Sequence, residues 1–185
     1  MRGVGGFTFV ELIVGIAIVL MLAAVVTPTV TASLDRTRRE QGVGILSRLA
    51  NSVVLFRSAV GRYPGRLSQL NNQITTSDTN SCGSTFNPAQ VSGWSEPFYN
   101  ERVLTPGGPY PVYIGNAEDQ LVRISLGGNN ALLGVVVNDV RTEDALILDR
   151  DYDGSDGSTA GSIRWGTANA SGQVTMQFLM PISGC

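Results

Sequence analysis

The sequence has no histidine and no lysine, and only two of its 185 residues are cysteine. Without histidine, the commonest general base and metal ligand is missing, and both Ser-His-Asp and Cys-His arrangements are excluded. The motifs G-x-S-x-G, G-x-x-x-x-G-K-[ST] and G-x-G-x-x-G are also absent. Catalysis by a pair of carboxylates remains possible, but no sequence motif identifies such a pair. The sequence therefore predicts a protein that is not an enzyme.

Charged and aromatic residues are also scarce, at 15% and 7%, and the formal net charge is −2. Such a balance gives no electrostatic reason to expect a nucleic-acid partner. The few aromatic residues form no ladder that would support electron conduction. Apart from the N-terminal apolar stretch described next, the length suits one globular domain.

An apolar run covers residues 12–26, and one carboxylate, Glu11, stands directly before it. About 20 largely apolar residues span a bilayer as a helix. A charged side chain inside such a span costs about 2.5–3.5 kcal/mol or more. A positive charge from a neighbouring copy at the same depth would offset this cost, so Glu11 is interpreted as an assembly residue.

The N-terminal pattern of Arg2, Gly6-Phe7, Glu11 and Pro28 resembles the type III signal of type IV pilins and type II secretion pseudopilins. The resemblance implies that a prepilin peptidase removes residues 1–6 by cutting between Gly6 and Phe7. It further implies that Phe7 is N-methylated and that Glu11 pairs with the Phe7 ammonium of an adjacent subunit. Pro28 falls where many family members have a proline that loosens the helix.

Two simpler interpretations of the N-terminus remain open. One is a conventional secretory signal, with Arg2 as its charged region and residues 30–32 as a small-residue cleavage site. The other is a plain single-pass membrane anchor. Neither interpretation requires Phe7 or Glu11.

A long helix is predicted from Phe7 to about Val60, interrupted only by Pro28. Residues 7–30 would form a transmembrane or filament-core segment, and residues 31–62 an amphipathic continuation. Five apolar residues at spacings of three or four predict the face that packs on the globular part: Ile45, Leu49, Val53, Phe56 and Val60. Gly61 and Pro64 should end the helix, and Leu67 and Leu70 suggest a short second helix.

The remaining residues, 63–185, are predicted to form a globular head. Residues 71–111 have the composition of a long connecting loop. Six short apolar or alternating runs between residues 112 and 180 predict strands: 112–114, 121–126, 132–137, 145–148, 162–165 and 174–180. Gly-Gly-Asn-Asn at 127–130 indicates a hairpin. The expected fold class is α+β, with the long helix packed on a C-terminal antiparallel sheet.

The two cysteines are Cys82 and Cys185. If the N-terminal helix holds the head outside the cytoplasm, the compartment is oxidising and a disulfide between them is expected. Two free thiols are the alternative.

Four aspartates lie close together at Asp149, Asp151, Asp153 and Asp156, and a glycine follows the third. Alternate carboxylates on a tight turn can converge on one hard cation, as in the first half of a calcium loop. The twelfth position is Ala160 rather than glutamate, so a full EF-hand is not expected. Type II secretion pseudopilins commonly bind calcium in C-terminal loops, and the resemblance thus favours Ca²⁺ over a merely solvated acidic turn.

Together these features predict a structural subunit of a type IV pilus-like helical filament, with copies of itself as the main partner. The other expected partners are the prepilin peptidase, the assembly machinery and the bacterial inner membrane. After assembly, the subunit would lie in an extracellular pilus or a periplasmic pseudopilus. The alternatives are a type II secretion pseudopilin and, from another class, a membrane-anchored calcium-binding adhesion module.

Overall fold

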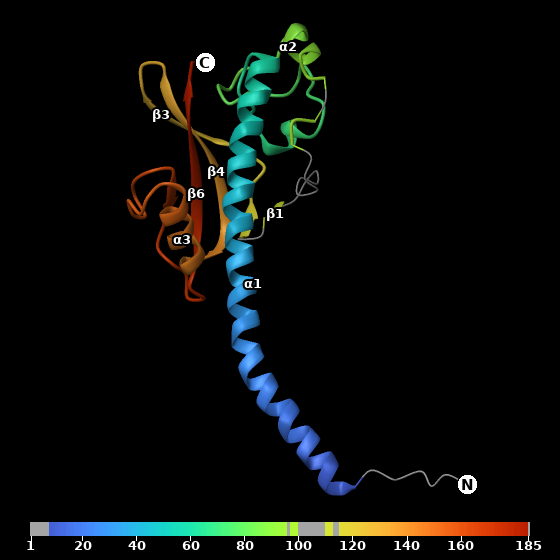
Figure 1. The fold of residues 1–185 in the computed structure, drawn as a ribbon. Coiled ribbons are helices and arrows are strands. Elements are labelled where there is room, and N and C mark those ends of the chain that lie inside the picture. Colours follow the sequence, from blue (N-terminus) through green and yellow to red (C-terminus); the bar gives the residue numbers. More distant parts are fainter. Residues whose placement is uncertain (1–7, 96, 100–109, 113–114, 185) are drawn as a thin grey trace, which may run out of the picture. The chain divides into compact units, whose positions relative to one another are not determined.

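The structure is a computed structural model, and it describes residues 8–95, 97–99, 110–112 and 115–184. Gly6, Phe7 and Cys185 lie outside the described residues, as does the predicted leader. The chain divides into two compact units, Met1–Arg38 and Arg39–Cys185. Helix α1 covers Phe9–Val60 and therefore has a part in each unit (Figure 1).

In the first unit, the helical segment Phe9–Ala24 is apolar and exposed along its length. Phe9 is 76% exposed and Met21 is 72% exposed. Among the described residues, the helical stretch long and apolar enough to cross a bilayer is Glu40–Val60, whereas Phe9–Ala24 is shorter. One face of Glu40–Val60 is buried in the head, so this segment is not a better candidate for the membrane span. The span predicted at residues 7–30 stays a prediction.

The second part of α1 buries the predicted apolar stripe. Ile45, Leu49, Val53, Phe56 and Val60 are each at most 5% exposed. The amphipathic spacing of a helix therefore identified its buried face correctly.

Helix α1 ends at Gly61, as its sequence predicts. Gly61 has φ +82°, and its amide donates to the Arg57 carbonyl at 2.9 Å. This left-handed conformation favours glycine because glycine has no Cβ. The predicted short helix follows as the 3-10 helix η1 (Leu67–Leu70).

An antiparallel sheet forms the C-terminal part of the second unit (Figure 1). Its described strands are β1 (Tyr110–Val112), β2 (Gly115–Ala117), β3 (Val122–Gly127), β4 (Asn130–Arg141), β5 (Ile163–Trp165) and β6 (Gln173–Ser183). The order is β1-β2-β4-β6-β5, and β3 also pairs with β4. The predicted hairpin is confirmed because Gly127 pairs with Asn130. The α+β class with an antiparallel sheet is likewise confirmed.

Alternating residues of the two long strands supply most of the sheet's core face. Leu133, Val135 and Val137 of β4 pair with Met180, Phe178 and Met176 of β6. All six belong to one buried cluster, together with Leu49, Val53 and Phe56 of α1. The alternating apolar residues of β4 and β6 and the apolar face of α1 therefore pack in one core.

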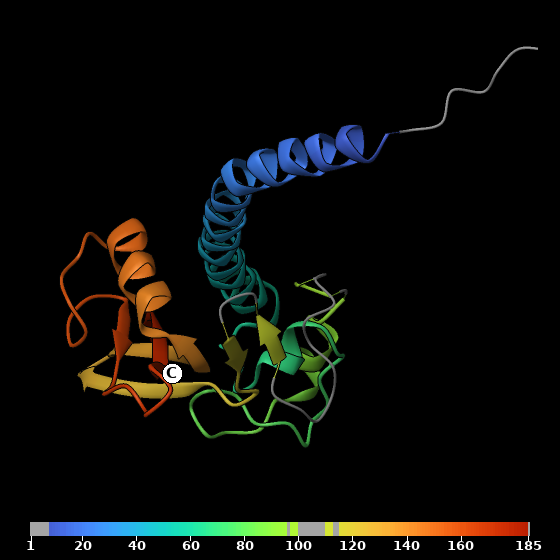
Figure 2. The ribbon, with the colours of Figure 1, turned by 90° about the horizontal axis from the view of Figure 1, so that it is seen from below.

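The predicted strand at residues 145–148 is wrong, because these residues lie in helix α3 (Thr142–Tyr152). Arg141 occupies the N-cap position, and its guanidinium donates to the carboxylate of Asp144 in the first turn at 2.8 and 3.0 Å. Ala145 and Leu148, three residues apart, bury the same face. A four-residue apolar run fits a strand or a helix equally well, and only the packing of α3 over the sheet distinguishes them (Figure 2).

The region expected to be one long loop, residues 71–111, contains a helix among its described residues. This is helix α2 (Pro88–Ser92), whose first turn is capped by Asn87 through a 2.9 Å bond from the Gln90 amide. Phe86 from this region is buried in the core. Apolar anchors and a cap therefore fix a segment whose composition alone indicates a loop.

Candidate functional site

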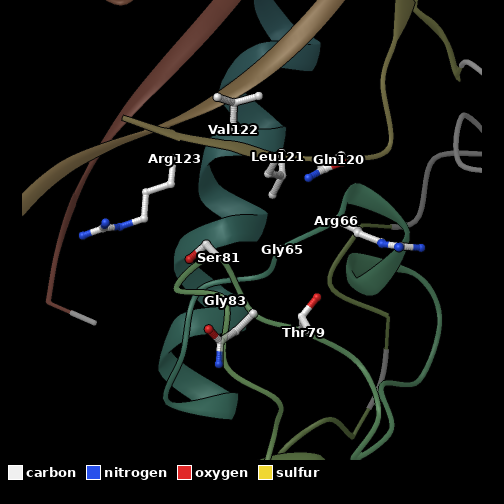
Figure 3. Close-up of a pocket in the computed structure, with 10 residues that line it drawn as sticks. Gly65, Arg66, Thr79, Ser81, Gly83, Gln120, Leu121, Val122 and Arg123 are labelled. Atoms are coloured by element: carbon white, nitrogen blue, oxygen red, sulfur yellow. The ribbon is translucent and has the colours of Figure 1, made fainter. Parts of the chain in front are cut away.

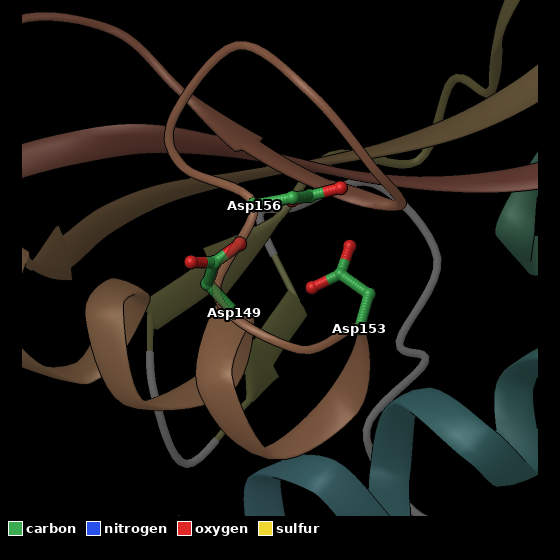
Figure 4. Close-up of side chains that lie close together, drawn as sticks. All are labelled: Asp149, Asp153 and Asp156. Carbon is green, nitrogen blue, oxygen red and sulfur yellow. The ribbon is translucent and has the colours of Figure 1, made fainter.

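Three of the four predicted aspartates come together at the end of α3. Asp149, Asp153 and Asp156, called the acidic triad below, each offer a carboxylate oxygen within 4.8 Å of the others (Figure 4). Asp149 lies in the last turn of α3, Asp153 caps its C-terminus, and Asp156 lies in the loop that follows.

Asp151 does not join the acidic triad, contrary to the alternating spacing expected from the sequence. Successive residues of a helix are 100° apart, so residues 149 and 151 face different directions, whereas residues 149 and 153 share a face. Asp151 instead accepts a 2.8 Å hydrogen bond from Nε of the exposed Arg150. The prediction failed here because it assumed a loop where the chain is helical.

Asp149 is the most constrained member of the acidic triad. The residue is only 3% exposed. Its Oδ2 accepts a long 3.4 Å bond from the Gly157 amide, while its buried Oδ1 has no hydrogen-bond partner in the described structure. Burial, and next the nearby Asp153 and Asp156 carboxylates, raise the pKa of Asp149 despite the Gly157 bond. A buried acceptor without a donor is costly, and a cation at this position would remove the cost.

Asp153 is held in place by the chain that leads into β5. Its Oδ2 accepts hydrogen bonds from the amides of Ser162 at 2.5 Å and Ile163 at 2.9 Å. Its buried Oδ1 has no partner in the described structure. One oxygen thus positions the loop, and no donor in the described structure satisfies the other.

Gly161 lies directly against the acidic triad. A Cβ at this position would collide with carboxylate oxygens of Asp153 and Asp156, and the residue has φ +64°. The sequence analysis did not single out Gly161. Its importance comes from its contact with Asp153 and Asp156, which the amino-acid sequence does not reveal.

The atoms of the acidic triad that could bind a metal are all carboxylate oxygens, and the three groups carry up to three negative charges. Hard cations such as Ca²⁺ and Mg²⁺ prefer such ligands. Calcium takes 6–8 oxygens, so carbonyls or waters would have to complete its shell. The Asp149 carbonyl already accepts hydrogen bonds from the amides of residues 153, 154 and 155.

At the N-terminal end, Glu11 has a local partner that the sequence analysis missed. Its Oε2 accepts hydrogen bonds from the Thr8 amide at 3.0 Å and the Thr8 hydroxyl at 2.8 Å. The Glu11 amide donates back to the Thr8 hydroxyl at 3.3 Å. This is a capping box, and the spacing T-x-x-E before an apolar run is its sequence signal.

The remaining predicted residues are only partly described. Pro28 lies within the bounds of α1. Cys82 is disulfide-bonded, but its expected partner, Cys185, lies outside the described residues. The peptidase site at Gly6 and Phe7 also lies outside them, so the processing and pairing roles stay predictions.

Comparison with known proteins returned no match to a family model, a curated protein or a solved structure.

Proposed function

We propose that this protein is a structural subunit of a type IV pilus-like filament, assembled from the bacterial inner membrane after prepilin peptidase cleavage. The observation that carries the proposal is the exposed apolar helical segment Phe9–Ala24 with a single carboxylate, Glu11, near its start. So much contiguous apolar surface marks contact with a membrane or with other proteins.

Lipid and neighbouring subunits would cover this segment in turn. Before assembly the helix lies in the membrane, where intrahelical bonds satisfy its backbone. During assembly it exchanges lipid for equivalent helices of other copies. A heterologous contact that does not close on itself generates a helical fibre. In this proposal α1 is one long helix, and its buried stripe at residues 45–60 connects the fibre core to the head.

The capping box refines the proposed role of Glu11. Hydrogen bonds from Thr8 satisfy part of the carboxylate, but both donors are neutral and leave its negative charge in place. In a low-dielectric surrounding that charge still requires a cation. The Phe7 ammonium of an adjacent copy would supply it, while Thr8 holds the carboxylate in position.

The mature N-terminus tests the class of protein. Mass spectrometry of the protein from its native membrane should find Phe7 as the first residue, heavier by one methyl group. A start at Ser33 would indicate ordinary secretion, and an intact leader would indicate a plain anchor. Either of these results would contradict the proposal.

Two substitutions separate assembly from capping. Glu11→Ala removes the charge and one half of the capping box, whereas Thr8→Val removes only the hydroxyl half. We expect Glu11→Ala to be processed and inserted normally but to reduce filament yield at least tenfold, with Thr8→Val close to wild type. Equal losses in sheared-filament assays of both variants would show that Glu11 acts only as a cap.

A second candidate function, a calcium-binding type II secretion pseudopilin, is favoured by the acidic triad. In this proposal Ca²⁺ is held by Asp149, Asp153 and Asp156, with the unpartnered Oδ1 atoms of the first two as ligands. The same observation suits the membrane-anchored calcium-binding adhesion module, which the mature N-terminus would separate from both filament proposals.

Thermal melts of the full chain test the calcium site. Calcium should raise the melting temperature relative to chelator, and Asp149→Asn should abolish the shift. Asp151→Asn is the matched control, because it removes an equal charge two residues away, outside the triad, and should keep the shift. Unchanged midpoints over a wide calcium range would reject the site and leave the filament proposal standing.

A further inference from the structure

The connection between β5 and β6 carries a sequence pattern that none of the roles above uses. Asn169, Ala170 and Ser171 match the acceptor motif for N-linked glycosylation, an asparagine followed two positions later by serine or threonine with no proline between them. Asn169 is the only asparagine of the sequence that satisfies this motif. A motif this short also arises by chance, so the structure around it decides its meaning.

The whole connection lies on the surface. Residues 166–172 are all exposed, and they precede β6 at the end of that strand opposite the C-terminus (Figure 1). A glycan is bulky and solubilising and needs such a surface position. Charged residues make up 15% of the sequence, against about 25% in a typical soluble domain. A glycan would thus add polar surface to a chain that has few charges of its own.

Hydrogen bonds hold the motif in a tight turn. Oδ1 of Asn169 accepts from the amides of Ser171 at 2.9 Å and Gln173 at 3.0 Å. The Asn169 amide donates to the Gln173 carbonyl at 2.8 Å, and the Gly172 amide donates to the Asn169 carbonyl at 3.0 Å. The amide and hydroxyl of Thr142 donate to the Gly172 carbonyl at 3.1 and 2.8 Å. The turn is therefore fixed to the start of α3.

The same turn leaves the side-chain nitrogen of Asn169 nearly free. Nδ2 makes one contact, with Oε1 of Gln173 at 3.5 Å, which is longer than a normal hydrogen bond. A carboxamide nitrogen has two N–H bonds, so one remains for this contact when the other is replaced by a bond to a sugar. Because the turn is formed by Oδ1 and the backbone, it is compatible with a substituted Nδ2.

Formation of the turn explains the asparagine at position 169 but not the serine at position 171. An asparagine whose side chain accepts from the amide two residues later is a common turn former. From Ser171 the turn uses only the backbone amide. The Ser171 hydroxyl has no hydrogen-bond partner in the part of the chain that the structure describes. The motif requires a hydroxyl at this position, whereas the fold does not.

We propose that Asn169 is an acceptor for N-linked glycosylation by an oligosaccharyltransferase that uses a sugar carried on a lipid pyrophosphate. Nδ2 of Asn169 attacks the anomeric carbon of the sugar, and a C–N bond forms. The bond from that carbon to the pyrophosphate oxygen breaks, the lipid pyrophosphate leaves, and the nitrogen gives up one proton. The inference rests on the proposed function in one respect, namely that the head is exported across the membrane.

Peptide mapping of the protein from its native membrane tests the site. After reduction, trypsin releases residues 165–185 as one peptide, because Arg164 precedes them and no arginine or lysine follows. We expect this peptide to be heavier by the mass of an oligosaccharide, with fragmentation placing the added mass on Asn169. An unmodified peptide, or a sugar carried only by serine or threonine, would overturn the proposal.

Substitutions within the motif assign the modification. Asn169→Gln and Ser171→Ala should each lose the added mass, although Ser171→Ala keeps the backbone amide that the turn uses. Ser171→Thr should retain the modification. Asn129→Gln, which changes an exposed asparagine of the β3–β4 hairpin outside the motif, is the control and should be modified like wild type. A Ser171→Ala protein that still carries the sugar on Asn169 would contradict recognition of the motif.

The same digest distinguishes this inference from the proposed function. A methylated peptide that begins at Phe7, together with an unmodified Asn169, would reject glycosylation and leave the filament proposal standing. A glycosylated Asn169 in a protein that keeps its leader would support the modification and contradict the filament proposal.

Discussion

At the scale of single residues, Asp149 shows how burial changes the chemistry of a carboxylate. The same residue type at position 151 is paired with an exposed arginine, whereas Asp149 is enclosed with two other acids. Its carboxyl group pays a desolvation cost when charged, and this cost is the first cause of its raised pKa.

The raised pKa of Asp149 predicts how stability without calcium depends on pH. The folded protein binds this proton more tightly than the unfolded chain does, so the stabilising contribution is present at low pH and is lost as pH rises through the folded pKa. In chelator, the Asp149 contribution should therefore favour folding more at mildly acidic than at neutral pH. Asp149→Asn should lose this contribution, and Asp151→Asn should keep it.

Thermal melts of these variants across that pH range provide the measurement. The informative quantity is the difference between each variant and wild type, because other carboxylates titrate in the same range. A difference curve for Asp149→Asn that does not vary with pH would contradict the prediction.

At the scale of elements, the second part of α1 is held to the head by its aromatic contact. Phe56 is fully buried and lies edge-on to Phe86 at 6.1 Å and to Phe98 at 5.4 Å between ring centroids. Both partners come from the segment whose composition indicates a loop. The helix therefore orders that segment as well as packing on the sheet.

Removing this side chain should be among the most destabilising changes in α1. Phe56→Ala should lower the free energy of unfolding of the head by about 3–5 kcal/mol, because it leaves a cavity among aromatic rings. Val54 lies two residues away but is 62% exposed, so Val54→Ala should change it by about 0.5 kcal/mol or less. Denaturant unfolding would measure both, and equal effects would contradict the assignment of the buried face.

At the scale of the whole molecule, a disulfide at Cys82 constrains the head. The expected partner, Cys185, is about 100 residues further along the chain. Closing a loop of that length removes much of the unfolded chain's freedom, worth up to about 4–5 kcal/mol in the chain-entropy model.

Loss of the bond should therefore lower stability. Cys82→Ser should melt at a lower temperature than wild type, and reductant should lower the wild-type midpoint toward that of the variant. Ser81→Ala, a neighbouring change that leaves both cysteines, is the control. Peptide mapping without reductant should recover a Cys82–Cys185 cross-link, and two titratable thiols in the folded protein would refute the pairing.

Features set by short stretches of sequence could be predicted without the structure. The stripe from Ile45 to Val60 is encoded by helical spacing, the end of α1 by Gly61, and the β3–β4 hairpin by the turn at residues 127–130. The capping box of Thr8 and Glu11 could also have been predicted, from the spacing T-x-x-E before an apolar run. Each feature depends on residues within a few positions of one another, because over such short distances the backbone geometry fixes where the side chains lie.

Features that depend on the partners of a segment required the tertiary structure. The run at residues 145–148 became a helix because its apolar face packs on the sheet, and that helix then separated Asp151 from the acidic triad. The isolated bridges of Pro64 with Asn80 and of Arg66 with Gln120 join three segments that lie far apart in sequence (Figure 3). Local sequence determined the repeating patterns of this protein, and long-range packing decided which charged groups were brought together and removed from water.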